Sequence, residues 1–167
     1  MAQDILFKTS DYLFSYRVAG ILIRNGRVLL QKPSNDPGYA FPGGHVSFGE
    51  TNAQTLEREF REEIGAEIKT GALAWVGELF FPWKDRTCHQ ICLYYLVSLS
   101  EESSIPLSGT FQGVETLEDR NFQMNYSWVD LSCTAELELY PPQAKDLLLQ
   151  GFDRTHHFIY RETGEVL

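Results

Sequence analysis

Glu59, Glu62 and Glu63 are three acidic residues whose spacing could bind a metal ion. They lie in the segment TNAQTLEREFREEIG at positions i, i+3 and i+4. If this segment is a helix, the three carboxylates project together from adjacent turns. Like charges at this spacing destabilise a helix slightly, whereas carboxylate oxygens suit a hard cation such as Mg²⁺ or Mn²⁺. The alternative is an acidic helix face that is simply solvated, and for three glutamates alone this is the commoner case.

The same segment carries the signals of one amphipathic helix. Thr51 is a suitable N-cap with Gln54 three residues later, as in a capping box, and Gly65 is a suitable C-terminal stop. At about 100° per residue, the apolar residues form a stripe about 80° wide, and the three glutamates lie about 110° around the helix from it. The stripe predicts the face that packs on the core, and its members are Ala53, Leu56, Phe60 and Ile64.

Residues before the helix extend the acidic cluster into a longer motif. Gly44 is followed by five residues, then Glu50, then seven residues, and then the run REFREEIGA, which begins at Arg58 and ends at Ala66. This pattern resembles the Nudix box, G-x5-E-x7-R-E-U-x-E-E-x-G-U, in which U is apolar. All seven fixed letters match in register, and Ala66 is a smaller residue than is usual at the last U. At about one chance in fifteen per letter, an accidental match is on the order of one in a million. The sequence is therefore identified as a member of the Nudix hydrolase (MutT-like) family.

The resemblance implies a role for each residue of the box. Glu59, Glu62 and Glu63 would be ligands of Mg²⁺, for which Mn²⁺ could substitute, and the carbonyl of Gly44 would join them. One of the glutamates, or a water that it holds, would help to deprotonate the attacking water. Arg58 and Glu50 would form a salt bridge that braces the loop against the helix. Divalent ions would stabilise charge on the phosphate oxygens and lower the pKa of bound water.

The segments around the box predict an α+β fold. Apolar, β-rich residues 12–23 and 27–31 flank Asn25-Gly26, which is a strong hairpin signal. Further strands are expected over 66–81, 87–99, 126–129 and 157–160, and a second helix from Pro141 or Pro142 to Leu149. Residues 101–125 are polar and predict a long surface loop or an irregular hairpin. The resemblance implies an α/β/α sandwich with a mixed β-sheet and a loop-helix-loop box at 44–66, in one domain over residues 1–167.

Composition restricts the class of protein. The 167 residues carry a net charge of −9, which disfavours nucleic acid as a partner, since nucleic-acid binding requires a basic face. The longest apolar runs are too short to span a membrane, and the first residues lack the pattern of a signal peptide. Cys88, Cys92 and Cys133 form neither a disulfide framework nor a zinc pattern. We therefore expect a cytoplasmic monomer or homodimer with reduced thiols, whose partner is a small nucleotide-type substrate.

The residues outside the box leave the substrate and one acidic group open. Many relatives use a further acid outside the box, and Glu115, Glu118 or Asp119 could serve, although an exposed loop acid is the commoner case. Aromatic and histidine residues near the predicted strands could contact the substrate, although most aromatic residues are core. The candidates of these types are Phe81, His89 and Tyr16, and Pro82 is a further candidate.

The position of Pro82 slightly favours one substrate class, that of the ADP-ribose pyrophosphatases. It lies sixteen residues after Ala66, as a proline tends to do in ADP-ribose pyrophosphatases of the family, although a proline that merely ends a strand is commoner. We expect Mg²⁺-dependent hydrolysis of a diphosphate bond in a nucleoside diphosphate linked to another group, such as ADP-ribose. The alternatives are a MutT-type pyrophosphohydrolase of 8-oxo-dNTPs or NTPs, a non-catalytic nucleotide-binding regulator, and an isoprenoid diphosphate isomerase, which would want an additional catalytic cysteine or acid.

Overall fold

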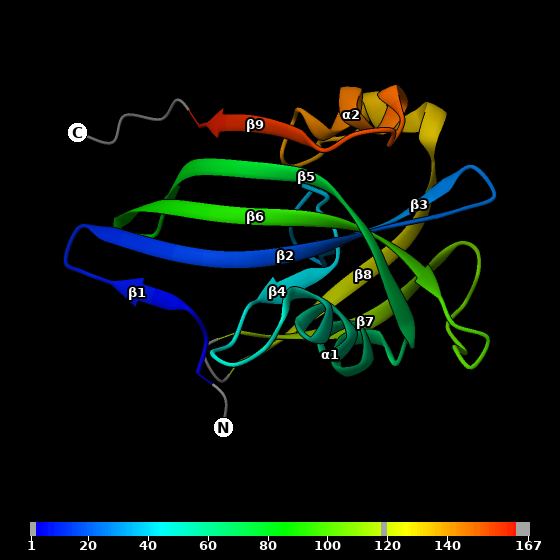
Figure 1. The fold of residues 1–167 in the computed structure, drawn as a ribbon, viewed down its shortest axis with the longest axis horizontal. Coiled ribbons are helices and arrows are strands. Elements are labelled where there is room, and N and C mark those ends of the chain that lie inside the picture. Colours follow the sequence, from blue (N-terminus) through cyan, green and yellow to red (C-terminus); the bar gives the residue numbers. More distant parts are fainter. Residues whose placement is uncertain (1–2, 118–119, 163–167) are drawn as a thin grey trace.

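The structure is a computed structural model that describes residues 3–117 and 120–162. Its strands form one mixed sheet in the order β7-β8-β3-β2-β6-β5-β9, and β1 and β4 also pair with β2 (Figure 1). The mixed sheet expected from the sequence is confirmed. The elements are β1 (Leu6–Lys8), β2 (Tyr12–Arg24), β3 (Arg27–Pro33), β4 (Gly43–His45), α1 (Asn52–Ile64), β5 (Ile68–Trp83), β6 (Arg86–Leu99), β7 (Thr110–Leu117), β8 (Arg120–Asp130), η1 (Leu131–Glu136), α2 (Ala144–Gln150) and β9 (His156–Arg161).

Strand β2 organises the sheet because its two edges have different partners. One edge pairs in parallel with β6 from Tyr12 to Leu22. The opposite edge pairs with β1 near its start, then with β4, and with β3 only at its end. The predicted β2–β3 hairpin is confirmed, and its turn residues Asn25 and Gly26 have φ values of 50° and 73°. Because β3 diverges from β2 after this turn, β4 and the segment before it, residues 40–42, enter between them.

The two helices lie on opposite faces of the sheet (Figure 1). Successive residues of a strand point to opposite faces, so Val18 and Leu22 pack in the core under α1, whereas Ala19 and Ile21 pack in the core under α2. This arrangement confirms the α/β/α sandwich. Neither helix in the described part of the chain is long and apolar enough to cross a membrane.

Helix α1 begins and ends where its caps predict. The Thr51 side chain accepts a hydrogen bond from the Gln54 amide at 3.2 Å, and the Gln54 side chain accepts one from the Thr51 amide at 2.8 Å. Gly65 has the left-handed φ of 67°, which glycine adopts at little cost. Of the predicted apolar stripe, Leu56 and Phe60 are buried, whereas Ala53 and Ile64 are half-buried.

Two predicted elements differ in the structure. Residues 101–125 were expected as a loop or irregular hairpin, but β7 and β8 form an antiparallel pair in continuous register from Thr110↔Ser127 to Leu117↔Arg120. The pair tolerates polar residues because much of β7 is exposed. Helix α2 begins at Ala144 rather than at Pro141 or Pro142, which lie in the turn before it. The three cysteines are free, as expected.

Candidate active site

The Arg58–Glu50 pair connects helix α1 to the loop before it. Arg58 Nε donates to Glu50 Oε1 and Arg58 Nη2 donates to Glu50 Oε2, each at 2.9 Å. Thr55 Oγ1 also donates to Glu50 Oε2 at 2.9 Å. The hydrogen bonds from Arg58 are the largest cause of a lowered pKa of Glu50. The predicted salt bridge is therefore present, and it holds Glu50 ionised.

Glu59 lies directly against β4. A Cβ atom at Gly44 would overlap the Glu59 carboxylate, so only glycine leaves room for this side chain. Arg58 Nη1 donates to Glu59 Oε1 at 2.6 Å, which fixes the carboxylate at the same point. Gly44, the first glycine of the predicted box, thus allows the backbone of β4 to approach the Glu59 carboxylate closely.

Glu63 is a buried carboxyl group with one unpartnered oxygen. Its Oε2 accepts a hydrogen bond from the Tyr126 hydroxyl at 2.7 Å, and its Oε1 is buried without a hydrogen-bond partner among residues 3–117 and 120–162. Burial raises the pKa of Glu63 to about 9, and the nearby Glu59 carboxylate contributes to the rise. A buried unpartnered acceptor is costly, and a divalent cation would satisfy it while favouring the ionised form.

Glu62 behaves differently from its two neighbours. Its side chain is 61% exposed, and within the described part of the chain it contacts Arg58 Nη1 at 3.3 Å. Among the described residues, no three His, Cys, Asp or Glu side chains are grouped closely enough to hold a metal ion. The three glutamates are therefore not gathered at one point in this structure, and their joint role as metal ligands stays a prediction. Glu59 and Glu63 turn inward, and Glu62 follows the surface of the helix.

Two further charged residues face the inward pair. Arg17, on β2, lies 3.7 Å from Glu115 Oε1 through its Nη2 and donates to the Gly43 carbonyl at 3.3 Å. Arg17 also interacts electrostatically with Glu59 and Glu63. Arg17 was not predicted from the sequence, although a lone arginine within an apolar strand could have indicated it. Glu115 was one of three candidates for the further acid outside the box. The other two candidates, Glu118 and Asp119, lie outside the described residues.

Arg17 and Glu115 line a cavity of about 350 Å³. Apolar and aromatic side chains from strands and loops line most of its wall, including Phe41, Phe81, Trp83 and Tyr140. A smaller cavity of about 70 Å³ lies beside it towards β1 and contains His45. Arg17, Phe81, Trp83 and Gln90 line both cavities. The arrangement offers a largely apolar volume whose wall includes the Arg17–Glu115 pair.

Strand alternation places the four candidate substrate residues differently. Phe81 lines both cavities. Pro82, His89 and Tyr16 line neither, because each follows or precedes a cavity residue on its strand and so points to the opposite face. Tyr16 instead donates to Asn52 Oδ1 of α1 at 2.7 Å.

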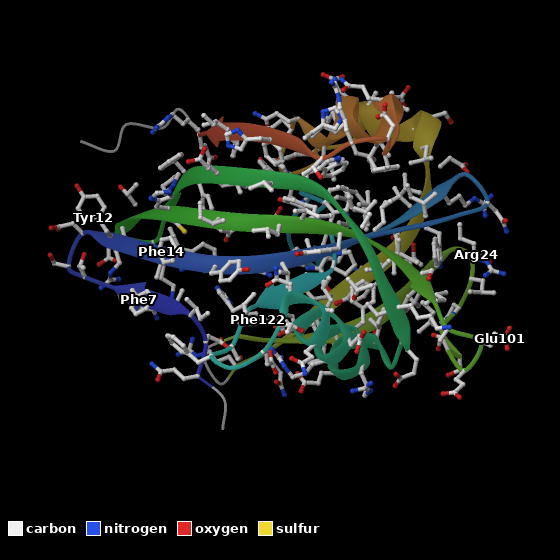
Figure 2. All side chains as sticks on the ribbon, in the orientation of Figure 1. Phe7, Tyr12, Phe14, Arg24, Glu101 and Phe122 are labelled. Atoms are coloured by element: carbon white, nitrogen blue, oxygen red, sulfur yellow. The ribbon has the colours of Figure 1, made fainter. Side chains whose placement is uncertain are left out.

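The His89 ring belongs to an aromatic group at one end of the sheet. It stacks on Phe80 with centroids 4.4 Å apart and meets Phe14 edge-on at 5.9 Å. Phe7 and Phe14 lie at this end (Figure 2), where their ring centroids are 6.2 Å apart. His89 therefore packs against rings on the face that carries α1, away from the cavities.

Comparison with known proteins agrees with this geometry. The family model of the NUDIX domain matches residues 15–147. The chain belongs to the Nudix hydrolase family. An ADP-ribose pyrophosphatase of Methanocaldococcus jannaschii is 33% identical over 85 residues, which are 49% of this chain and 49% of that protein. The nucleoside triphosphatase NudI of Enterobacter sp. is 30% identical over 115 residues, which are 58% of this chain and 77% of that protein.

A solved Nudix structure shows the same fold. The MutT protein from Bacillus halodurans is 17% identical, and the match covers 92% of this chain and 94% of that chain with a TM-score of 0.57. The sequence matches cover less of the chain than the structural match does. The chain spans only about half the length of the M. jannaschii protein that it matches. The two curated relatives carry different substrate names, so Nudix membership leaves the substrate of this chain open.

Proposed function

We propose that this Nudix protein is a Mg²⁺-dependent hydrolase that cleaves a diphosphate bond in a small nucleotide-type substrate. The observation that carries the proposal is the buried, unpartnered Glu63 Oε1 beside Glu59. The Glu59 carboxylate is itself packed on Gly44. A hard cation fits this donor set because it accepts carboxylate oxygens and offsets the cost of burying their charge.

Glu59, Glu63 and the Gly44 carbonyl would hold the cation, with Glu62 available from the solvent side. When bound, Mg²⁺ supplies charge stabilisation to the phosphate oxygens and lowers the pKa of a bound water. Arg58 and Glu50 keep the loop and the helix in register, which positions Gly44 against Glu59. Glu115 is the carboxylate placed to accept the proton of the attacking water, and its contact with Arg17 at 3.7 Å orients it.

For the substrate, we propose a nucleoside diphosphate linked to a second group, such as ADP-ribose. Among the described residues that line the large cavity, Arg17 is the one cation, and it already pairs with Glu115; Glu162 adds a second carboxylate to the wall. A triphosphate brings more negative charge than such a wall can neutralise, whereas sugar hydroxyls are neutral and can donate to carboxylates. The name of the M. jannaschii relative supports this choice.

The second candidate is pyrophosphohydrolysis of an NTP or an 8-oxo-dNTP. The name of the Enterobacter relative favours it, and so does the position of the exposed Glu62, which could bind an additional ion beside a longer phosphate chain. In this case the apolar cavity would hold the base and the phosphate chain would extend towards α1.

A substrate panel separates the two candidates. The purified chain is given ADP-ribose, 8-oxo-dGTP and ordinary NTPs at one Mg²⁺ concentration, and kcat/KM is measured for each by release of phosphate, pyrophosphate or AMP. Glu63→Gln serves as the control for contaminating hydrolases. A preference of tenfold or more for any triphosphate over every diphosphate-linked compound would reject the ADP-ribose-like assignment. Hydrolysis of none of these compounds, with the fold intact, would reject the proposed reaction.

A further inference from the structure

Gln31 is a buried glutamine whose side chain lines the large cavity. Its relative exposure is 4%, and its Oε1 is buried without a hydrogen-bond partner in the described part of the chain. The main chain of Gln31 is fully engaged, because its N–H and its carbonyl bond to Ala40 at 2.8 Å each. Strand β8 flanks it on the other side, where Tyr126 is its register partner. The backbone is thus held between two neighbours, and within the described residues the side-chain Oε1 is left without a donor.

An amide in this situation is unusual for a folded protein. More than nine in ten buried polar groups have a partner, and a buried acceptor left without one costs about 1–3 kcal/mol. An apolar residue would fill the same position on β3 without that cost, as Leu29 and Leu30 do beside it. The glutamine is therefore explained most directly by a donor that a bound molecule supplies.

The surroundings define the kind of donor. Arg17 and Glu115 in the cavity wall interact with the acidic pair, so the phosphates of a substrate belong beside them. The rest of the wall is largely apolar, and Phe81 and Tyr140 are rings on which a planar group can stack. A terminal amide presents an acceptor and a donor side by side. Its complement on a purine is an amino group beside a ring nitrogen, which is the edge that glutamine recognises on adenine.

We propose that Gln31 is the specificity-determining residue for the base and that it selects adenine through the 6-amino group. This inference rests on the proposed nucleotide substrate. Gln31 Oε1 accepts from the 6-amino group and its amide nitrogen donates to N7, the ring nitrogen on the same edge. On this edge hypoxanthine and guanine present two acceptors, O6 and N7, so either base loses one of the two hydrogen bonds even if the amide of Gln31 rotates.

Binding of nucleoside monophosphates tests the inference without turnover. Calorimetric titration of the wild-type chain with AMP, IMP and GMP, at one Mg²⁺ concentration, is expected to give a Kd for AMP at least about tenfold below that for IMP and GMP. Gln31→Met, which keeps the length of the side chain and removes the amide, is expected to weaken AMP to within about threefold of IMP. Gln112→Met makes the same chemical change at an exposed position of β7 and should leave the AMP preference unchanged.

Several outcomes would overturn the assignment. Equal affinity of the wild type for AMP and IMP, or tighter binding of GMP, rejects adenine selection before any variant is made. Retention of the AMP preference in Gln31→Met, or in a second variant Gln31→Leu, removes Gln31 from recognition. Failure of the base site can be distinguished from failure of the proposed reaction. A wild type that prefers AMP but hydrolyses no diphosphate supports the base site and rejects the hydrolase function. A wild type that hydrolyses diphosphates but binds AMP, IMP and GMP equally supports the hydrolase function and rejects the base site.

Discussion

The Arg58 guanidinium meets the Glu50 carboxylate through two hydrogen bonds of 2.9 Å each, in the bidentate geometry that makes such pairs strong. The same guanidinium also donates to Glu59. One arginine therefore joins the loop before α1, the helix itself and a carboxylate that faces the site. Both side chains of the Arg58–Glu50 pair are half-buried, at 27% and 21% exposure.

Arg58→Ala is expected to lower both activity and stability. The substitution leaves Glu50 partly buried without its cation, and we expect a loss of about 1–3 kcal/mol in the free energy of unfolding, less than for a fully buried pair. Arg61→Ala is the matched control on the same helix, because Arg61 pairs with Glu67 at the surface. Thermal unfolding of the three proteins measures the difference. Equal melting temperatures for Arg58→Ala and the wild type would show that the brace contributes nothing.

Glu63→Gln is expected to reduce turnover by at least about a hundredfold while the metal-free protein keeps its melting temperature. Glutamine retains the shape and the acceptor for the Tyr126 hydroxyl, but it cannot supply a charged ligand. The affinity for Mg²⁺, measured by calorimetry, should fall with it. Glu57→Gln is the control, since Glu57 lies on α1 outside the acidic stripe. Near-normal turnover by Glu63→Gln would remove this residue from the site.

Excess chelator provides the companion measurement. We expect EDTA to abolish hydrolysis by the wild type and Mg²⁺ or Mn²⁺ to restore it, because the inward carboxylates repel the phosphate oxygens unless a cation lies between them. Full activity in excess EDTA would contradict the metal-dependent reaction.

Glu115→Gln is expected to lower kcat by about tenfold or more and to change KM for ADP-ribose much less, as for a residue that acts on the proton of the attacking water. The fold should be retained, because glutamine keeps the shape of the side chain and Glu115 contacts Arg17 at 3.7 Å rather than forming a close ion pair. Glu101→Gln, in an exposed turn, is the control. If the kcat of Glu115→Gln equals that of the wild type, the proton acceptor lies elsewhere.

The box and its helix could be predicted because their signals are local. Thr51, Gln54 and Gly65 act on neighbouring residues, and the Arg58–Glu50 pair follows from the motif. The inward or outward direction of each glutamate could not be predicted, since it depends on Tyr126, which reaches Glu63 from a strand 63 positions away.

The cavity residues were harder to predict for a related reason. A shift of one residue along a strand moves a side chain to the other face, and this separates Phe81 from Pro82 and Tyr16 from Arg17. Gln31 and Arg17 carry no local signal beyond being polar residues in apolar strands. Their significance appears only when β2, β3 and β7 are brought around one cavity.

His45 should make the stability of the metal-free protein sensitive to acid. Burial is the main cause that lowers the pKa of His45 to about 3, and Arg17 and Lys8 lower it further. The unfolded chain takes up this proton near pH 6.5. Between pH 6.5 and about 3 the unfolded state therefore binds more protons, so the stability present above pH 6.5 is lost as pH falls through this range.

The size of this effect is measured against His45→Gln, which cannot titrate. Both proteins are unfolded with urea in EDTA at pH 7.5 and pH 5.0. Because every other titratable group is common to both, its contribution to the free energy of unfolding cancels in the comparison. Over this step the wild type is expected to lose about 1–2 kcal/mol more than the variant, since each pKa unit between the folded and unfolded states is worth about 1.4 kcal/mol. Equal losses would mean that His45 protonates as readily in the folded protein as in the unfolded chain. The desolvated environment between Arg17 and β1 would then be absent in solution.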